Sequence, residues 1–160
     1  MRRELLVCIA LIFMAPALAM AERPETGTYI KDMDRSGYGQ LAMHNNESQD
    51  AIVVAADLDV RPLIAVYVRA GESFIITGIN DGKYVIYSTA GKDWSSTRCT
   101  FADPRGYYKF GEPIEVKTTD LGDDVESSGF DITLWEVSLG QSNFVPDFFE
   151  FPDLGRYNIG

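Results

Sequence analysis

Short runs of apolar and β-branched residues, separated by clusters of Gly, Asn, Asp and Pro, follow one another along the chain from Tyr38 onward. This spacing is typical of strands joined by turns. Residues 114–119 alternate apolar or threonine side chains with more polar ones, which predicts a strand with one face in solvent. Residues 51–56 and 63–68 are apolar on both alternating faces, which predicts two central strands that are covered on both sides.

No long window carries the 3.6-residue apolar period of a helix, so helix is expected to be minor, with a single turn near residues 146–149 as the best candidate. The sequence therefore predicts an all-β fold, a two-sheet antiparallel β-sandwich of about eight to nine short strands, with a small barrel as the alternative. The apolar parity changes between Leu134 and Trp135, which predicts a β-bulge there. The expected strands cover residues 39–44, 51–57, 63–69, 73–77, 83–89, 98–102, 107–110, 114–119 and 130–139.

The first 21 residues have the three parts of a secretory signal peptide. Arg2 and Arg3 form a basic start, residues 5–15 form an apolar run of 11, and Ala19 and Ala21 are small residues of the kind found at cleavage sites. We expect residues 1–21 to be removed by cleavage after Ala21, with Ala19 as the alternative. The apolar run is shorter than the roughly 20 residues that span a bilayer. The expected location is therefore periplasmic or secreted, with no membrane attachment after cleavage.

The rest of the chain is expected to form one domain. Residues 22–37 are polar and include Pro24 and Gly27, which predicts a flexible lead-in with a short strand at residues 28–31. Residues 38–160 form the predicted single β-sandwich domain. Its carboxyl-terminal residues 144–152 include four phenylalanines, which would favour aggregation if they lay in water. We expect this segment to dock on its own domain, with docking on a partner as the alternative.

Composition and charge narrow the range of partners. The 160 residues are 46% hydrophobic and 24% charged, as in an ordinary globular domain, and their formal net charge is −10. Removing residues 1–21 takes away two arginines and one glutamate, so the charge becomes −11. Nucleic acids and anionic membranes select for basic surfaces, so neither is an expected partner. Cleavage also leaves Cys99 as the one cysteine, which excludes an internal disulfide and leaves an intermolecular one as the alternative.

One segment has a distinctive local pattern. Residues 70–87 read as two strands around Asn80-Asp81-Gly82, a turn whose residues tolerate positive φ. This hairpin resembles that of transthyretin-like modules, including carboxypeptidase regulatory-like domains and collagen-adhesin B-type repeats. Together with Gly-Lys-Asp-Trp at residues 91–94 and Tyr-Tyr-Lys-Phe at residues 107–110, it also resembles an uncharacterised family of small exported prokaryotic β-sandwich domains. The resemblance implies a β-sandwich with a non-catalytic role, and it transfers no binding or catalytic residue.

Aromatic residues beside charged ones form a candidate binding surface. Trp94, Tyr107 and Tyr108 offer flat rings to a sugar or a protein, while Asp93 and Arg98 would add hydrogen bonds. These five residues are the predicted binding site for a protein or carbohydrate ligand. The alternative is that the rings fill the core or close its ends. Trp94 follows a Gly-Lys-Asp turn, so it is expected to be the most exposed of them.

The other reactive side chains favour structural roles. His44, the single histidine, sits in turn-like sequence without any Gly-x-Ser-x-Gly elbow in the chain, so we expect an exposed turn residue and no catalytic role. Cys99 alternates in step with Phe101, which predicts a half-buried strand position and an inert thiol. The acidic residues 120–126 predict a solvated turn, with a calcium loop as the alternative. No metal or other cofactor is therefore expected.

The expected function is a non-enzymatic structural or binding role in the cell envelope or outside the cell. The first alternative is an inhibitor-like protein that sequesters a basic partner, because a large negative charge attracts one. The second is a hydrolase with paired carboxylates, for example Asp81 or Asp93 with Glu112 or Glu115, which would have to lie about 5–10 Å apart.

Overall fold

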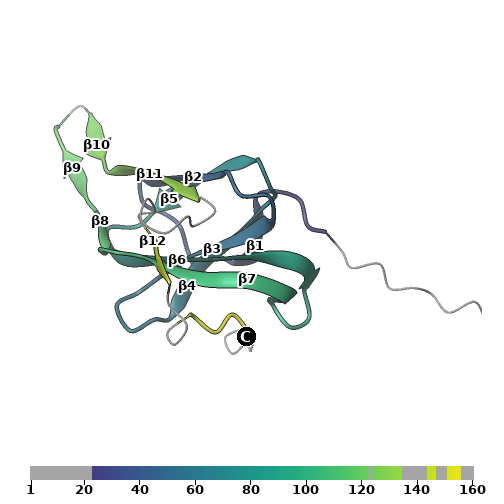
Figure 1. Ribbon diagram of the computed structural model, residues 1–160. Coiled ribbons are helices and arrows are strands. Elements are labelled where there is room, and N and C mark those ends of the chain that lie inside the picture. The colour runs from purple at the N-terminus through teal and green to yellow at the C-terminus, as the bar shows by residue number, and fades with distance from the viewer. Residues whose placement is uncertain (1–22, 123, 135–143, 147–150, 156–160) are drawn as a thin grey trace, which may run out of the picture.

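The computed structural model describes residues 23–122, 124–134, 144–146 and 151–155, and this part of the chain is all-β, without a helix (Figure 1). The predicted fold class is thereby confirmed. The strands are β1 (Thr28–Lys31), β2 (Gly39–Asn45), β3 (Asp50–Ala56), β4 (Pro62–Val68), β5 (Ser73–Ile79), β6 (Gly82–Ser95), β7 (Thr100–Phe110), β8 (Ile114–Val116), β9 (Thr118–Asp120), β10 (Val125–Ser127), β11 (Gly129–Leu134) and β12 (Phe144–Pro146).

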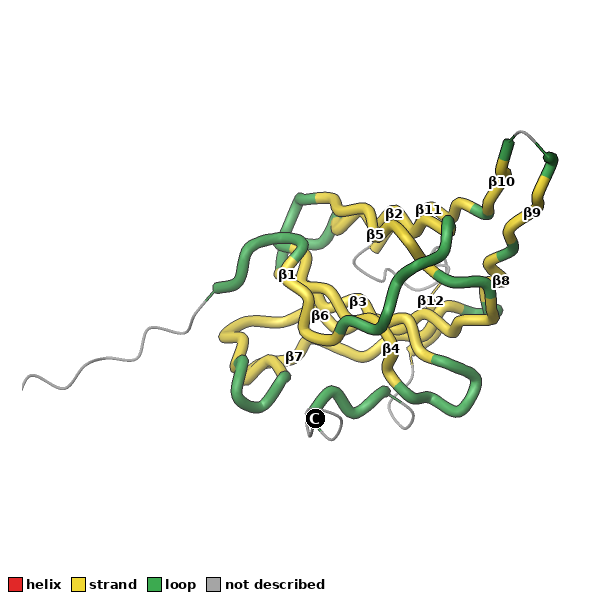
Figure 2. Tube along the Cα trace, turned by 180° about the vertical axis from the view of Figure 1, so that it is seen from behind, coloured by secondary structure: helices red, strands yellow, loops and turns green. Residues whose placement is uncertain are grey.

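Two sheets face each other, and neither closes into a barrel (Figures 1 and 2). The large sheet has the strand order β1-β4-β3-β6-β7-β12, with β8 also paired to β6, and every pair in it is antiparallel. The small sheet has the order β11-β2-β5. The hairpin expected at residues 70–87 is therefore wrong, because β5 belongs to the small sheet and β6 to the large one, so the turn between them connects the two sheets. The remaining pair, β9 and β10, forms a separate hairpin that extends away from the two sheets (Figure 1).

One strand pair differs from the expected antiparallel arrangement. Strand β11 pairs with β2 in parallel, with Phe130 opposite Leu41 and Ile132 opposite Met43. Parallel neighbours need a long crossover connection, and strands β3, β4, β6, β7 and β8 of the large sheet lie between these two strands in the sequence. When the chain returns to the small sheet, β11 therefore runs in the same direction as β2.

The main core lies between the two sheets. Strand β2 alternates between a buried and a wet face, since Leu41 and Met43 point inward and are fully buried while Gln40 is exposed. Removing such side chains from water contributes roughly 1.5–3 kcal/mol each. The inward-facing residues from the large sheet and its partner include Val53, Val66, Val68, Ile76, Ile79, Ile86, Ile132 and Leu134.

The outer face of the large sheet is also covered, which confirms the prediction that β3 and β4 are buried on both sides. Trp94 and Phe101, near the far end of the β6–β7 hairpin, pack in a second apolar cluster with Tyr67 of β4. Strand β4 lies two strands away from β6 in the sheet order, so the end of this hairpin must bend over the outer face. A register shift between Ala90 and Gly91 provides the bend.

The carboxyl-terminal segment covers another part of the same face. Residues 151–155 lie on the side of the large sheet that faces away from the small sheet (Figure 2). Leu154 is buried, and the ring of Phe151 lies 5.0 Å from that of Tyr107 and 6.2 Å from that of Tyr87, measured between centroids. For these residues, and for β12 on the edge of β7, the expected docking on the chain's own domain is confirmed.

Several element boundaries differ from the expected ones. Strands β6 and β7 have 14 and 11 residues and are not short, and the strand expected at residues 114–119 is divided at Lys117 into β8 and β9. Strand β1 is where the sequence places it, but the flexible lead-in is tied to the sheet, since the Gly27 amide donates to Tyr67 O at 2.9 Å. Residues 1–21, the bulge at Trp135 and most of the turn at residues 146–149 lie outside the described residues.

Candidate functional site

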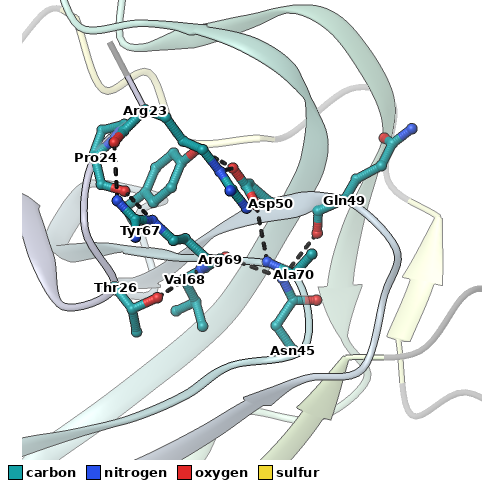
Figure 3. Close-up of polar contacts among 10 residues, drawn as sticks. All are labelled: Arg23, Pro24, Thr26, Asn45, Gln49, Asp50, Tyr67, Val68, Arg69 and Ala70. Atoms are coloured by element: carbon teal, nitrogen blue, oxygen red, sulfur yellow. Dashed lines mark hydrogen bonds and ion pairs between the residues drawn. The ribbon is translucent and has the colours of Figure 1, made fainter.

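A single carboxylate, that of Asp50 at the start of β3, joins three parts of the chain (Figure 3). Arg23 donates to it in the bidentate manner, with Nε and Nη2 each 2.7 Å from one carboxylate oxygen. The Tyr67 hydroxyl donates at 2.6 Å and the Ala70 backbone amide at 2.9 Å. Four donors saturate the carboxylate, so Asp50 fixes the amino-terminal segment and the end of β4 against β3.

These contacts set the charge states of the network. Burial alone would raise the pKa of Asp50, but the hydrogen bonds from Arg23, Tyr67 and Ala70 outweigh burial and lower that pKa to about 2. Burial and the same hydrogen bond raise the pKa of the Tyr67 hydroxyl. Asp50 is therefore ionised and Tyr67 is neutral at ordinary pH.

A second set of hydrogen bonds holds the loop before Asp50. Asn45 is fully buried, and its side-chain amide donates to Gln49 O at 2.9 Å and to Val68 O at 3.0 Å. Arg69 donates from Nε to Pro24 O at 2.8 Å (Figure 3). The loop between β2 and β3 is thus held against β4, which places Gln49 and Asp50 side by side at one end of the sandwich.

Beside this network lies a cavity of about 370 Å³, which we call the Trp94 cleft. Its size is within the usual range for small-ligand sites. A second cavity of about 500 Å³ adjoins it and shares Arg23 and Trp94 with it. The Trp94 cleft is lined by Arg23, Ser48, Gln49, Asp50, Tyr67, Ala70, Gly91, Lys92, Asp93 and Trp94, and the second cavity adds Thr28, Tyr29, Ile30 and Ser96 among others.

Two polar atoms of the cleft lining lack partners. Trp94 is only 5% exposed, and its indole Nε1 has no hydrogen-bond acceptor within the described part of the chain. The Gln49 side-chain carbonyl, Oε1, is buried as well and has no donor among the same residues. An unpaired buried polar atom costs roughly 1–3 kcal/mol. Both residues belong to the lining of the Trp94 cleft, but these two atoms are themselves buried.

The five predicted binding residues do not form one surface. Trp94 and Asp93 line the Trp94 cleft, whereas Arg98 and Tyr107 line a third cavity of about 370 Å³ beside Phe151 and Leu154. Tyr108 packs against the core between the sheets, because neighbouring residues of β7 point to opposite faces.

The prediction that Trp94 is the most exposed of these residues is wrong. Its ring lies 5.8 Å from the ring of Tyr67 and 5.2 Å from that of Phe101, in edge-on geometry with both. Asp93, at φ 53°, occupies the left-handed region beside it, and this backbone twist turns Trp94 inward from a position that reads as a turn.

Gln49, Asp50 and Arg23 line the cleft but were not predicted as site residues. The sequence carries one signal for Asp50, which is a carboxylate directly before the fully apolar run 51–56. Such a group needs partners when the strand is buried. Nothing in the sequence identifies Arg23 as the partner, because 27 residues separate the two.

His44 lies within β2, at the end of the strand expected at residues 39–44, and is half-buried, so the expectation of an exposed turn residue is wrong. Its Nδ1 lies 2.8 Å from Ser73 Oγ and its Nε2 lies 3.0 Å from Asp131 Oδ1, so the three side chains cross β5, β2 and β11 in a line. This is the residue order of a serine-hydrolase triad. The three cavities described above contain none of these residues, and the Asp131 side chain is 69% exposed, so the line is a cross-strand polar ladder on an open sheet face.

The carboxylates proposed for a hydrolase lie toward two different ends of β6. Asp81 accepts from the Thr118 amide and hydroxyl, Glu115 pairs with Lys117, and Asp93 lies toward the opposite end of β6 from the β8 pairing, about 30 Å along the strand. The proposed carboxylate pair of Asp93 with Glu115 is therefore wrong.

Cys99 is in the turn between β6 and β7 and not in a strand. Burial and the nearby Asp153 raise the pKa of its thiol, and its Sγ lies 3.4 Å from Ser96 O, both of which favour the protonated thiol.

Within the described residues, no group of three or more His, Cys, Asp or Glu side chains is arranged to hold a metal ion.

Within the same residues, no helix is long and apolar enough to span a bilayer. Comparisons of the chain with models of protein families, with curated proteins and with solved structures find no match.

Proposed function

We propose that the protein is an exported, non-enzymatic β-sandwich module that binds a ligand in the Trp94 cleft. The observation that carries this proposal is the cavity of about 370 Å³ beside the Asp50 network, whose lining combines the aromatic residues Trp94 and Tyr67 with hydrogen-bonding and charged side chains. Pockets that bind small ligands are typically of this size and have an apolar lining with a few polar groups.

The chemistry of the lining supports binding rather than catalysis. Asp50 is ionised and already accepts four hydrogen bonds, so it has no capacity left to act as a base. The Tyr67 hydroxyl is committed to Asp50. The remaining polar groups of the lining are amide, indole, hydroxyl and exposed charged groups, which orient a ligand but provide no activated nucleophile.

The test is an NMR titration that observes indole N–H resonances. The chain has two tryptophans, and the Trp94→Phe variant assigns the Trp94 signal by its disappearance. The protein is titrated with a panel of neutral and anionic oligosaccharides and with a panel of short peptides. A saturable shift of the Trp94 signal with a member of either panel supports a ligand site in this cleft. Shifts confined to other residues, or no shift with any compound, contradict it.

Sequestration of a basic partner is the second candidate function. The β9–β10 hairpin stands away from the sheets and carries exposed Leu121 and Val125 next to Asp120, Asp124 and Glu126 (Figure 1). Apolar contact combined with negative charge suits a basic protein surface. Pull-down at low and high salt, with the wild type and an Asp124→Asn/Glu126→Gln variant, tests this function. A captured set without basic proteins, or one that the variant leaves unchanged, removes it.

A further inference from the structure

We infer that the β9–β10 hairpin enters a narrow, basic cleft of a partner protein and is contacted there on both of its faces. This inference rests on the second candidate function, sequestration of a basic partner, and names the element that binds and the shape of the surface that receives it. It follows from the exposure of the hairpin, from the chemistry of its two faces and from the way in which its base is fixed.

The distal part of the hairpin is covered by neither sheet. Residues 119–122 and 124–126 are all exposed, and the apolar side chains among them are Leu121, at 60% exposed, and Val125, at 42%. Single exposed apolar residues are common on protein surfaces. Two of them on one short element that projects away from the sheets instead mark a candidate contact site for another protein (Figure 1).

The two faces of the hairpin carry the same chemistry. In the register of the ladder, Val125 lies opposite Asp120, so these two side chains share one face. Glu126 lies opposite Thr119 on the other face, and Leu121 follows Thr119 by two positions, which places it on that face as well. Each face therefore presents one apolar side chain and at least one carboxylate.

This arrangement fits a cleft better than a flat surface. A hairpin that lies on a flat surface has one apolar face and one polar face, because only one of its faces is covered. A cleft about 10 Å wide, the spacing of packed sheets, covers both faces at once. Basic walls would pair with Asp120 and Glu126, whereas a second copy of this chain, with its net charge of −10, would repel them.

The base of the hairpin is fixed to the sandwich. The Thr118 amide and hydroxyl donate to the Asp81 carboxylate at 3.0 and 2.7 Å, and the Ser127 hydroxyl donates to Tyr38 O at 2.7 Å. A two-stranded hairpin alone is at most marginally stable in water, so these contacts help to hold it in its projecting position. A hairpin that is ordered before binding loses less conformational entropy in the complex.

The test measures dissociation constants by calorimetry for the purified basic protein that the pull-down identifies. Leu121→Ser and Val125→Ser each remove the apolar side chain from one face, and each is expected to weaken binding at least about tenfold. Ile75→Ser removes a similarly exposed apolar side chain from the open face of the small sheet, so it is the matched control and is expected to leave binding unchanged. Thermal unfolding verifies that each variant is folded.

Charge provides the second readout. Asp120→Asn and Glu126→Gln act on opposite faces, and each is expected to weaken binding about threefold at about 50 mM salt and less at about 500 mM. Loss of affinity on one face alone overturns the inference in favour of docking on a flat surface, although a basic partner is bound. Affinity that both Leu121→Ser and Val125→Ser leave intact also overturns it, because another surface then binds the partner.

The failure of the inference can be distinguished from that of the functions on which it draws. A captured set without basic proteins removes the second candidate function and this inference together. Self-association that Val125→Ser abolishes would show that the hairpin binds a second copy of the chain, and this result overturns the inference as well. None of these outcomes bears on ligand binding in the Trp94 cleft, whose lining contains no residue of the hairpin.

Discussion

Asp50 fixes the geometry of the Trp94 cleft, although its own carboxylate oxygens are already occupied by hydrogen bonds within the protein. Its four hydrogen bonds attach Arg23, Tyr67 and Ala70 to the start of β3, and these groups form one wall of the Trp94 cleft. The Asp50 side chain is only 12% exposed, so its interactions with Arg23 and Tyr67 are weakly screened by solvent. The stability of the site should therefore depend on the charge of this carboxylate.

Asp50→Asn is expected to lower the free energy of unfolding at neutral pH by about 2 kcal/mol. The folded-state pKa of about 2 is below the ordinary 3.8, so ionised Asp50 stabilises the fold above pH 4, and this contribution is lost as the pH falls through 2. Urea unfolding between pH 7 and pH 2 should show a flatter pH dependence in the variant. The exposed Asp103→Asn is the control. Parallel curves for Asp50→Asn and the wild type would show that Asp50 is not the anchor.

Ser73→Ala tests whether the line of Ser73, His44 and Asp131 is structural. We expect the variant and the wild type to hydrolyse p-nitrophenyl acetate no faster than the buffer does, and the free energy of unfolding to fall by less than about 1 kcal/mol, as for a cross-strand pair. Turnover by the wild type that disappears in Ser73→Ala would show instead that the protein is a hydrolase.

Residue chemistry in this protein is only partly predictable from the sequence. Trp94 and Asp93 are identified because an aromatic ring beside a carboxylate is a recognisable binding pattern. The burial of Trp94 is not predictable, because it depends on the positive φ of Asp93 and on Tyr67, a residue of another strand. Likewise, the Arg23–Asp50 pair is a consequence of the fold and not of local sequence.

The β6–β7 hairpin is the element that forms the cleft. Strand β6 continues through Gly-Lys-Asp at residues 91–93, where the sequence favours a turn, because the bulge at Ala90–Gly91 absorbs the irregularity and lets the strand bend. The pairing partners of strands are also hard to derive from one sequence. The alternation in β11 predicts a strand, but it cannot indicate that β11 pairs with β2 in parallel.

Gly91→Ala is expected to destabilise the protein by about 1–3 kcal/mol, the usual cost of overpacking. An added Cβ would lie 2.6 Å from Asp103 O and 2.7 Å from Phe101 Cβ, so the hairpin would have to shift at its bend. Near-ultraviolet circular dichroism should change as the surroundings of Trp94 loosen. Gly129→Ala is the matched control, since its Cβ would meet no atom within 4 Å. Equal stability of the two variants would contradict the role given to the bend.

On the scale of the whole molecule, the fold class was predictable because it depends on periodicity. The alternating and doubly apolar runs indicate one-sided and two-sided burial, and the sandwich satisfies both. The segments that cover the outer face of the large sheet were harder to predict. They are the bent hairpin and residues 151–155, whose docking depends on contacts with Tyr87 and Tyr107.

The proposed export makes a prediction about the mature chain. Expressed in a bacterial host with its own amino terminus, the protein is expected to accumulate outside the cytoplasm and to begin at Glu22, or at Met20 if cleavage follows Ala19. Arg23 would then lie next to the new terminus and remain attached to Asp50. Intact-mass measurement on fractionated cells tests this, and a full-length product confined to the cytoplasm would contradict export.

The position of a bound ligand is the most direct test of the central claim. A crystal structure of the protein with the compound that shifts the Trp94 resonance most is expected to show that compound in the Trp94 cleft, in contact with the lining residues Trp94, Asp93 and Arg23. A compound bound elsewhere, beside an empty cleft, would contradict it.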